Sequence, residues 1–233
     1  MPIFKSVNKD FFKTWSPEMA YVLGFFAADG SMVRNGRGAH FIEFKITDQE
    51  LLESIRLALG SHHTIAHLKR GGENWKTQFR LQIGNKTMFE DLASLGMTQN
   101  KSLTLRMPNV PSEHLSHFVR GYFDGDGNVY ANEYARKGRK TLSTTLLTGF
   151  TSGSKDFLEG LHRILSEHSI VAGGSLFARE SYFRLHYSVQ DSCGLYRFMY
   201  NTESSLFLSR KKTVFENYFN KAGIEINRIT LGA

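Results

Sequence analysis

Two aspartates stand at matching places in two similar stretches of the sequence. YVLGFFAADGSMV (21–33) closes its apolar run with Asp29, and FVRGYFDGDGNVY (118–130) closes with Asp126. Two carboxylates held close together repel each other unless they share a proton or a cation. Their oxygens suit Mg²⁺, and metal ions held between acids promote in-line displacement at a phosphodiester. The residue types therefore indicate metal-assisted phosphodiester hydrolysis.

The two stretches belong to a repeat that continues along the chain. The matches keep their order while their offset grows: Asp29 with Asp126 (97 residues), Thr47 with Thr151 (104), Phe79 with Phe183 (104) and Lys101 with Lys211 (110). The segment RMPNVPSE (106–113) contains two of the four prolines and is typical of a linker. We therefore predict an N-terminal repeat at 1–105, a linker at 106–113 and a C-terminal repeat at 114–233.

The hydrophobic period changes in the same order in both halves. A motif helix, begun by Ser16 in the first copy and by Ser112 in the second, precedes alternating strands such as FIEFKIT (42, 44 and 46 apolar). A helix at 48–59, a hairpin formed by HTIAHLKR and TQFRLQIG, and a closing helix follow. The pattern predicts an α+β fold of two α-β-β-α-β-β-α units with antiparallel sheets.

The small residues of the motif helices favour close helix packing. Gly24 in one copy and Gly121 in the other would let the two backbones approach across a shared pseudo-twofold axis. Both helices end in Asp-Gly, so this packing would bring Asp29 and Asp126 together.

The charge balance indicates a polyanionic partner. The 233 residues include 29 Lys and Arg against 22 Asp and Glu, a formal charge of +7, and nucleic acid is the first candidate. Cys193 is the only cysteine, which excludes an internal disulfide and a Cys-based zinc site, and we interpret it as a small buried hydrophobe. No run of eighteen apolar residues occurs, so we expect no membrane association and an intracellular location.

The segments VLGFFAADG and VRGYFDGDG resemble two degenerate copies of the motif that names the LAGLIDADG homing endonucleases. The resemblance spans nearly the whole chain, including the NKS and RKK segments near the ends of the halves. It implies two pseudo-symmetric αββαββα repeats, saddle-shaped antiparallel sheets that bind DNA, and motif helices packed at the pseudo-twofold interface. It also implies a monomeric, intron-encoded endonuclease that makes a double-strand break in a long asymmetric duplex.

The resemblance implies a set of site residues. The motif acids Asp29 and Asp126, with the backbone carbonyls of Ala28 and Gly125, would hold Mg²⁺; Mn²⁺ would substitute, and Ca²⁺ would bind without supporting cleavage. Lys101 and Lys211 would steady the phosphate or its water, with Arg210 and Lys212 as near alternatives. Asp48 and Ser152 match a polar position after the second strand. Asp124 has no acidic counterpart, since Ala27 takes its place, so we expect a structural role for it.

The outward rows of the strands are suited to reading DNA. Gln and Arg make bidentate contacts with base edges, and a two-stranded ribbon fits the major groove. The predicted base-facing residues are Gln78, Arg80, Gln82, Tyr182, Arg184, His186 and Ser188. The predicted basic contacts, suited to phosphates, are Arg34, Arg37, Lys45, Lys69, Arg70, Lys76, Arg136, Lys137, Arg139, Lys140 and Arg179.

Simpler interpretations remain for several of these features. An Asp-Gly after one helix is an ordinary helix end and turn, and DGDGNVYANEYA fails as a calcium loop because Val129 and Ala135 replace the required Gly and Glu. His62, His63 and His67 lie on a predicted strand without Cys partners and are better explained as surface or packing residues than as metal ligands. An RNA maturase that binds intron RNA, or a DNA-binding regulator, would use the same scaffold without cleavage.

Overall fold

The computed structural model describes residues 5–68, 77–135, 138, 142–201, 204 and 206–225. The chain divides into two compact units. The first contains residues 1–101 and 108–125, and the second contains 102–107 and 126–233.

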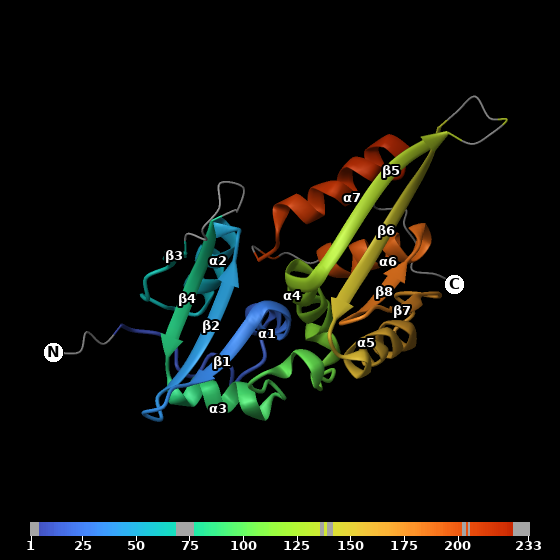
Figure 1. The fold of residues 1–233 in the computed structure, drawn as a ribbon. Coiled ribbons are helices and arrows are strands. Elements are labelled where there is room, and N and C mark those ends of the chain that lie inside the picture. Colours follow the sequence, from blue (N-terminus) through green and yellow to red (C-terminus); the bar gives the residue numbers. More distant parts are fainter. Residues whose placement is uncertain are drawn as a thin grey trace. The chain divides into compact units, whose positions relative to one another are not determined.

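The elements follow the predicted repeating order (Figure 1). The first copy consists of α1 (Pro17–Asp29), β1 (Gly30–Arg34), β2 (His40–Ile46), α2 (Gln49–Ala58), β3 (Ala66–Leu68), β4 (Gln78–Gly84) and α3 (Lys86–Ser94). Short 3-10 turns at Lys101–Leu103 and Ser112–His114 lead to the second copy. That copy consists of α4 (Leu115–Asp126), β5 (Gly127–Ala135), β6 (Leu142–Ser152), α5 (Lys155–Glu167), β7 (Ser175–Ala178), β8 (Phe183–Tyr187), α6 (Val189–Tyr200) and an additional helix α7 (Ser209–Ala222).

Two four-stranded antiparallel sheets confirm the predicted fold class. The first sheet has the order β1-β2-β4-β3 and the second the order β5-β6-β8-β7. Gly30 pairs with Phe44 in the first sheet, as Gly127 pairs with Phe150 in the second. The predicted hairpin is present as the antiparallel pair β3–β4.

The alternation of β2 determines which side chains enter the core of the first unit. Ile42 and Phe44 are fully buried, and the ring of Phe26 on α1 meets that of Phe44 edge-on at 5.3 Å between centroids. The opposite face of the strand carries Glu43 and Lys45, because successive side chains of a strand point to opposite sides.

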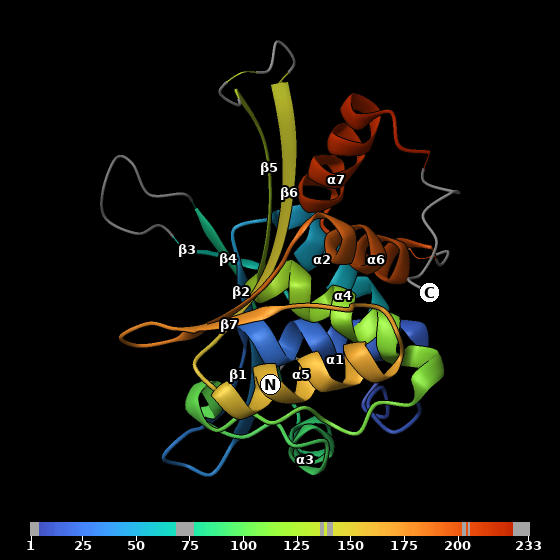
Figure 2. The same ribbon diagram turned by 90° about the vertical axis from the view of Figure 1, so that its right-hand side faces the viewer.

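In the second unit, α7 lies along the long ribbon formed by β5 and β6 (Figure 2). Its buried residues include Phe215 and Phe219, which pack with Tyr196 of α6. Cys193, also on α6, is 7% exposed, and burial raises the pKa of its thiol. This agrees with the interpretation of the cysteine as a buried hydrophobe.

The start of α1 is as predicted, and that of α4 is not. Ser16 Oγ accepts a hydrogen bond from Met19 N at 3.1 Å, and Pro17 occupies the first helical position. Ser112 lies instead in a 3-10 turn, and its hydroxyl bonds the neighbouring Glu113 at 3.4 Å. The prediction that Ser112 caps the second motif helix is therefore wrong, because the α-helix begins only at Leu115, after that turn.

Candidate active site and nucleic-acid interface

Each motif acid is the last residue of a helix that passes directly into a strand. Asp29 ends α1 before Gly30 opens β1, and Asp126 ends α4 before Gly127 opens β5. Asp29 is exposed and Asp126 half-buried. With no loop between the helix and the strand, each acid is fixed by a packed helix on one side and by a sheet on the other.

A buried lysine lies beside each acid. Lys101 Nζ donates to the carbonyl oxygen of Gly30 at 2.5 Å, and Lys211 Nζ donates to that of Gly127 at 2.6 Å. The two lysines are 5% and 6% exposed. Both copies therefore place an ammonium group on the carbonyl that follows the motif acid, although the lysines come from unlike elements, a 3-10 turn and the first turn of α7.

The neighbours of Lys211 do not share this position. Lys212 Nζ lies 3.6 Å from Glu216 Oε1 and 4.8 Å from the ring centroid of Phe207. Arg210 is exposed and lines, with Lys211 and Gly127, a hollow of about 190 Å³. Of the three predicted alternatives, Lys211 alone is bonded in the same way as Lys101 within the described residues.

Close contact between α1 and α4 confirms the predicted role of two glycines. A Cβ added at Gly24 would lie 2.0 Å from Phe118 O, and one added at Gly121 would lie 2.0 Å from Tyr21 O. Real Cβ atoms essentially never come nearer than 3.0 Å to such atoms. Only glycine at these two positions permits this approach of the helix backbones.

A buried polar cluster crosses the same helix pair. The hydroxyl of Tyr21 donates to Asp124 Oδ2 at 2.7 Å, and Asp124 is 1% exposed, which agrees with a structural role. The guanidinium of Arg120, also 1% exposed, lies 5.4 Å from the ring centroid of Tyr21. Arg120 Nη2 donates to His117 Nδ1 at 2.8 Å, because a guanidinium can only donate.

This environment makes His117 a weak base. Burial and then the nearby charge of Arg120 lower the pKa of His117 to about 4. The sequence analysis did not identify this cluster. The sequence signal for it is the three-residue spacing of His117 and Arg120 in an otherwise apolar stretch of α4, which places both side chains on one helix face.

The residues around Asp29 fit a divalent cation. A carboxylate at a helix C-terminus faces the negative end of the helix dipole, so a cation there is favourable. A Cβ at Gly125 would lie 2.4 Å from Ala28 Cβ and 3.4 Å from Asp29 Oδ2, so glycine leaves the carboxylate room. In the described part of the chain, no group of three or more His, Cys, Asp and Glu side chains could hold a metal ion. Carboxylate and carbonyl oxygens, such as those of Asp29 and its neighbours, are the ligand types that suit Mg²⁺ with retained waters.

Asp48 and Ser152 lie at positions that are not equivalent. Asp48 caps α2, where its Oδ1 accepts from Leu51 N at 3.0 Å. It also lines an open hollow with Glu50 and Glu53. Ser152 is the last residue of β6, and its Oγ accepts from Ser154 N at 3.1 Å.

The strand registers explain this difference. Phe44 pairs with Gly30 as Phe150 pairs with Gly127, so these two phenylalanines are equivalent. The offset between the two copies is therefore 106 residues along β2 and β6, and Lys45 corresponds to Thr151. The predicted match of Thr47 with Thr151 is therefore wrong by two residues, because β6 with its partner β5 is longer than the first hairpin. Ser154, which caps α5, is the true counterpart of Asp48.

The outer face of the first sheet holds several of the predicted DNA contacts together. Lys45 and Arg80 are paired across β2 and β4, and Gln82 is paired with Glu43. Gln78 opens β4 on the same row as Arg80. Arg34 ends β1 on the alternate row, paired with His40. Arg37 is exposed in the turn that follows β1, where its amide donates to Asn35 Oδ1. Glu43, a buried acid among these residues, was not predicted.

The second sheet presents a different set. Arg184 and His186 lie on β8, and the guanidinium of Arg184 stacks 5.1 Å from the ring centroid of Tyr182, just before the strand. Arg179 follows β7. Ser188 is the residue before α6 rather than part of the strand. The predicted contacts Lys69, Arg70, Lys76, Arg136, Lys137, Arg139 and Lys140 lie outside the described residues.

The histidines near β3 have protein partners. His62 Nδ1 bonds Ser6 Oγ at 2.6 Å, and His63 Nδ1 bonds Ser61 Oγ at 3.0 Å. The ring of His67 meets that of Phe79 at 4.9 Å. These contacts favour the packing interpretation of the three residues.

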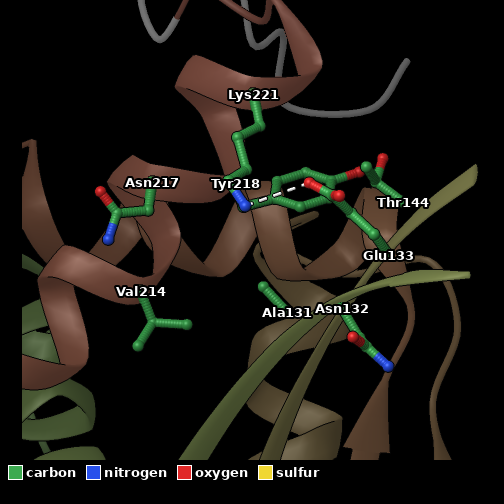
Figure 3. Close-up of a pocket in the computed structure, with 8 residues that line it drawn as sticks. All are labelled: Ala131, Asn132, Glu133, Thr144, Val214, Asn217, Tyr218 and Lys221. Carbon is green, nitrogen blue, oxygen red and sulfur yellow. Dashed lines mark ion pairs between the residues drawn. The ribbon is translucent and has the colours of Figure 1, made fainter. Parts of the chain in front are cut away.

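A pocket of about 540 Å³ lies between α7 and the β5–β6 ribbon (Figure 3). Lys221 and Glu133 form an ion pair of 3.1 Å across it, with Tyr218 beside them. Asn217 also lines the pocket. None of the predicted catalytic residues lines this pocket. Among the described residues, no helix is both long and apolar enough to cross a membrane.

Comparison with known proteins identifies both copies. The family model of the LAGLIDADG-like domain matches residues 16–95 and 113–188. Among curated proteins, an uncharacterized protein of Methanocaldococcus jannaschii is 23% identical over 56% of this chain. The DNA-directed RNA polymerase subunit Rpo1C of the same organism is 26% identical over 66% of the chain. The chain spans 48% and 16% of these two relatives, respectively.

Solved structures share the fold. The meganuclease I-SmaMI bound to uncleaveable DNA aligns with a TM-score of 0.62 at 14% identity, covering 93% of both chains. I-SmaMI bound to an uncleaved DNA target in the presence of calcium ions aligns with a TM-score of 0.58, covering 94% of both chains at 14% identity. The LAGLIDADG meganuclease I-AabMI bound to uncleaved DNA gives 0.60 at 15% identity, over 90% of this chain and 91% of that one.

Proposed function

Because the chain belongs to the LAGLIDADG-like domain family, we propose that it is a site-specific endonuclease that makes a double-strand break in a long, asymmetric DNA duplex. The observation that carries this proposal is that both copies place a buried lysine on the backbone carbonyl of the residue after the motif acid. Lys101 bonds the carbonyl that follows Asp29, and Lys211 bonds the carbonyl that follows Asp126. A protein that only binds nucleic acid would not need a motif acid and a buried lysine at matching places in both copies.

Each acid–lysine pair would serve one strand of the duplex. Asp29 and Asp126, with the carbonyls of Ala28 and Gly125, would be the ligands of Mg²⁺, for which Mn²⁺ would substitute. Bound Mg²⁺ supplies a polarised phosphate oxygen and a water of lowered pKa. Lys101 and Lys211 would attract the scissile phosphate and stabilise the charge that develops there. Their bonds to backbone carbonyls hold the ammonium groups in place before substrate arrives.

The outer faces of the two sheets would bind the duplex. Arg80 and Gln82 on one sheet and Arg184 and His186 on the other carry the donors and acceptors that base edges recognise. Because the two sets differ, the two half-sites would differ in sequence. Two copies in one chain would make the protein active as a monomer.

The test separates cutting from binding. A library of duplexes is incubated with the protein in Mg²⁺ and in Ca²⁺, retained duplexes are recovered, and newly formed ends are sequenced. We expect discrete double-strand ends in Mg²⁺ and selective retention without ends in Ca²⁺. Asp126→Asn and Asp29→Asn should each reduce cleavage at least a thousandfold, a loss of about 4 kcal/mol of transition-state stabilisation, with duplex retention within about threefold.

The matched control is Asp156→Asn. Asp156 is an exposed acid whose side chain is 62% accessible and pairs with Arg106 at 3.5 Å, so its loss should leave cleavage unchanged. Wild-type protein that retains a duplex selectively and never cuts it in Mg²⁺ would contradict the nuclease proposal and indicate a DNA-binding regulator. Retention of intron RNA alone would indicate a maturase.

A further inference from the structure

Glu43 is a buried acid on the outer face of the first sheet. It lies between Ile42 and Phe44, both of which point into the core, so its own side chain points to the opposite face. It is nevertheless only 4% exposed. A buried carboxylate is costly unless it is paired and hydrogen-bonded, so its neighbours must provide that compensation.

Four side chains converge on the Glu43 carboxylate. Lys45 Nζ lies 2.5 Å from Oε1, and Gln82 Nε2 donates to Oε2 at 3.1 Å. Arg80 Nη1 lies at ion-pair distance, 3.6 Å from Oε2, and Ser31 Oγ donates to Oε1 at 3.4 Å. Three of these four side chains belong to the predicted DNA-contacting set.

This arrangement restricts the groups that would read bases. A carboxylate only accepts hydrogen bonds, so it turns the amide nitrogen of Gln82 toward itself and leaves the amide oxygen directed elsewhere. The pairing with Arg80 occupies one end of the guanidinium and leaves its other donors available. Arginine and glutamine read base edges through bidentate contacts, which depend on these orientations.

The second sheet has no acid at the equivalent position. The registers match Glu43 with Gly149, because Glu43 pairs with Gln82 as Gly149 pairs with His186. A Cβ at Gly149 would lie 2.6 Å from Asn128 Oδ1 and 2.9 Å from His186 Cδ2, so neighbouring side chains fill the place. The acid is therefore specific to the first half of the molecule.

We propose that Glu43 is a positioning residue for DNA specificity: it holds Lys45, Arg80 and Gln82 in the arrangement that reads one half-site. Its negative charge also weakens binding to phosphates irrespective of sequence, because it neutralises part of the basic face. Specificity is a ratio of affinities, so the one residue raises that ratio in two ways. The proposal rests on duplex DNA being the partner, as proposed above.

The experiment measures base preference at every position of the site by selection from a duplex library, using the full chain in Ca²⁺. Arg80→Ala and Arg184→Ala first assign positions to the first and second sheets. Glu43→Gln should then reduce the base preference about tenfold at the base-pair positions that Arg80→Ala assigns to the first sheet (the Arg80 positions). It should also raise affinity for random duplex on the order of threefold and leave the Arg184 positions unchanged.

Two further variants separate charge from positioning. Glu43→Asp keeps the charge but withdraws the carboxylate by one methylene, so preference at the Arg80 positions should fall while random-duplex affinity stays at the wild-type level. Glu90→Gln removes an equal charge from α3, where Glu90 pairs only with the exposed Lys86 among the described ion pairs. It should change neither quantity.

The outcomes distinguish this inference from the proposed function. If Glu43→Gln keeps the wild-type preference, or loses it equally at the Arg80 and Arg184 positions, the positioning role is refuted. Wild-type protein that selects no duplex would refute the proposed function, and this inference with it. Selective binding without cleavage would contradict the nuclease proposal, but the Glu43 variants would still test the positioning role, because the selection measures binding.

Discussion

Replacing Gly121 with alanine tests the packing of the two motif helices. The new Cβ would lie 2.0 Å from Tyr21 O and 2.9 Å from Phe25 N, both backbone atoms of α1. To restore even the closest separation seen for real Cβ atoms, 3.0 Å, the backbones must part by at least 1.0 Å. Overpacking of this kind costs about 3 kcal/mol when the obstacle is a rigid backbone, whereas alanine in place of glycine gains about 1 kcal/mol of helix propensity.

The expected net loss for Gly121→Ala is therefore about 2 kcal/mol of unfolding free energy. It is measured by urea denaturation followed by circular dichroism, with the m-value checked for constancy. Gly36→Ala is the control, because a Cβ there meets nothing within 4 Å, and its effect should stay within about 0.5 kcal/mol. A Gly121→Ala protein as stable as the Gly36→Ala protein would refute the close approach of α1 and α4.

Two further predictions concern the polar cluster between these helices. Tyr21→Phe removes the 2.7 Å bond to Asp124 and should lower the unfolding free energy by about 1–3 kcal/mol, measured by urea denaturation; an unchanged midpoint would contradict that bond. The pKa of His117 is lowered to about 4, so the folded state binds fewer protons there than the unfolded state below about pH 6.5. Stability from this site is therefore complete above pH 6.5 and is lost as pH falls toward 4. Relative to His117→Gln, the unfolding free energy of the wild type should fall by about 2 kcal/mol between pH 7 and pH 4.5. Parallel curves of unfolding free energy against pH for the two proteins would contradict the lowered pKa.

Most of the fold could be predicted from the sequence because it depends on local and repeated patterns. The change of hydrophobic period predicted both αββαββα copies, and the glycine–aromatic motifs predicted where α1 and α4 end. The domain limits at 106–113 stay a prediction about the repeats. The predicted start of α4 was wrong, because a 3-10 turn at Ser112–His114 without a side-chain cap precedes the α-helix.

The candidate site divides in the same way between sequence and structure. The sequence by itself determined the candidates Asp29, Asp126, Lys101 and Lys211, since the same residue types recur in the same order in both copies. Only the tertiary structure decided that Lys211, rather than an adjacent basic residue, bonds the carbonyl beside the acid, because this depends on which face of α7 is buried. It alone also revealed the contacts of Glu43, which in sequence is one polar residue of an alternating strand. Its partners Arg80 and Gln82 lie far along the chain, and strand register brings them to it.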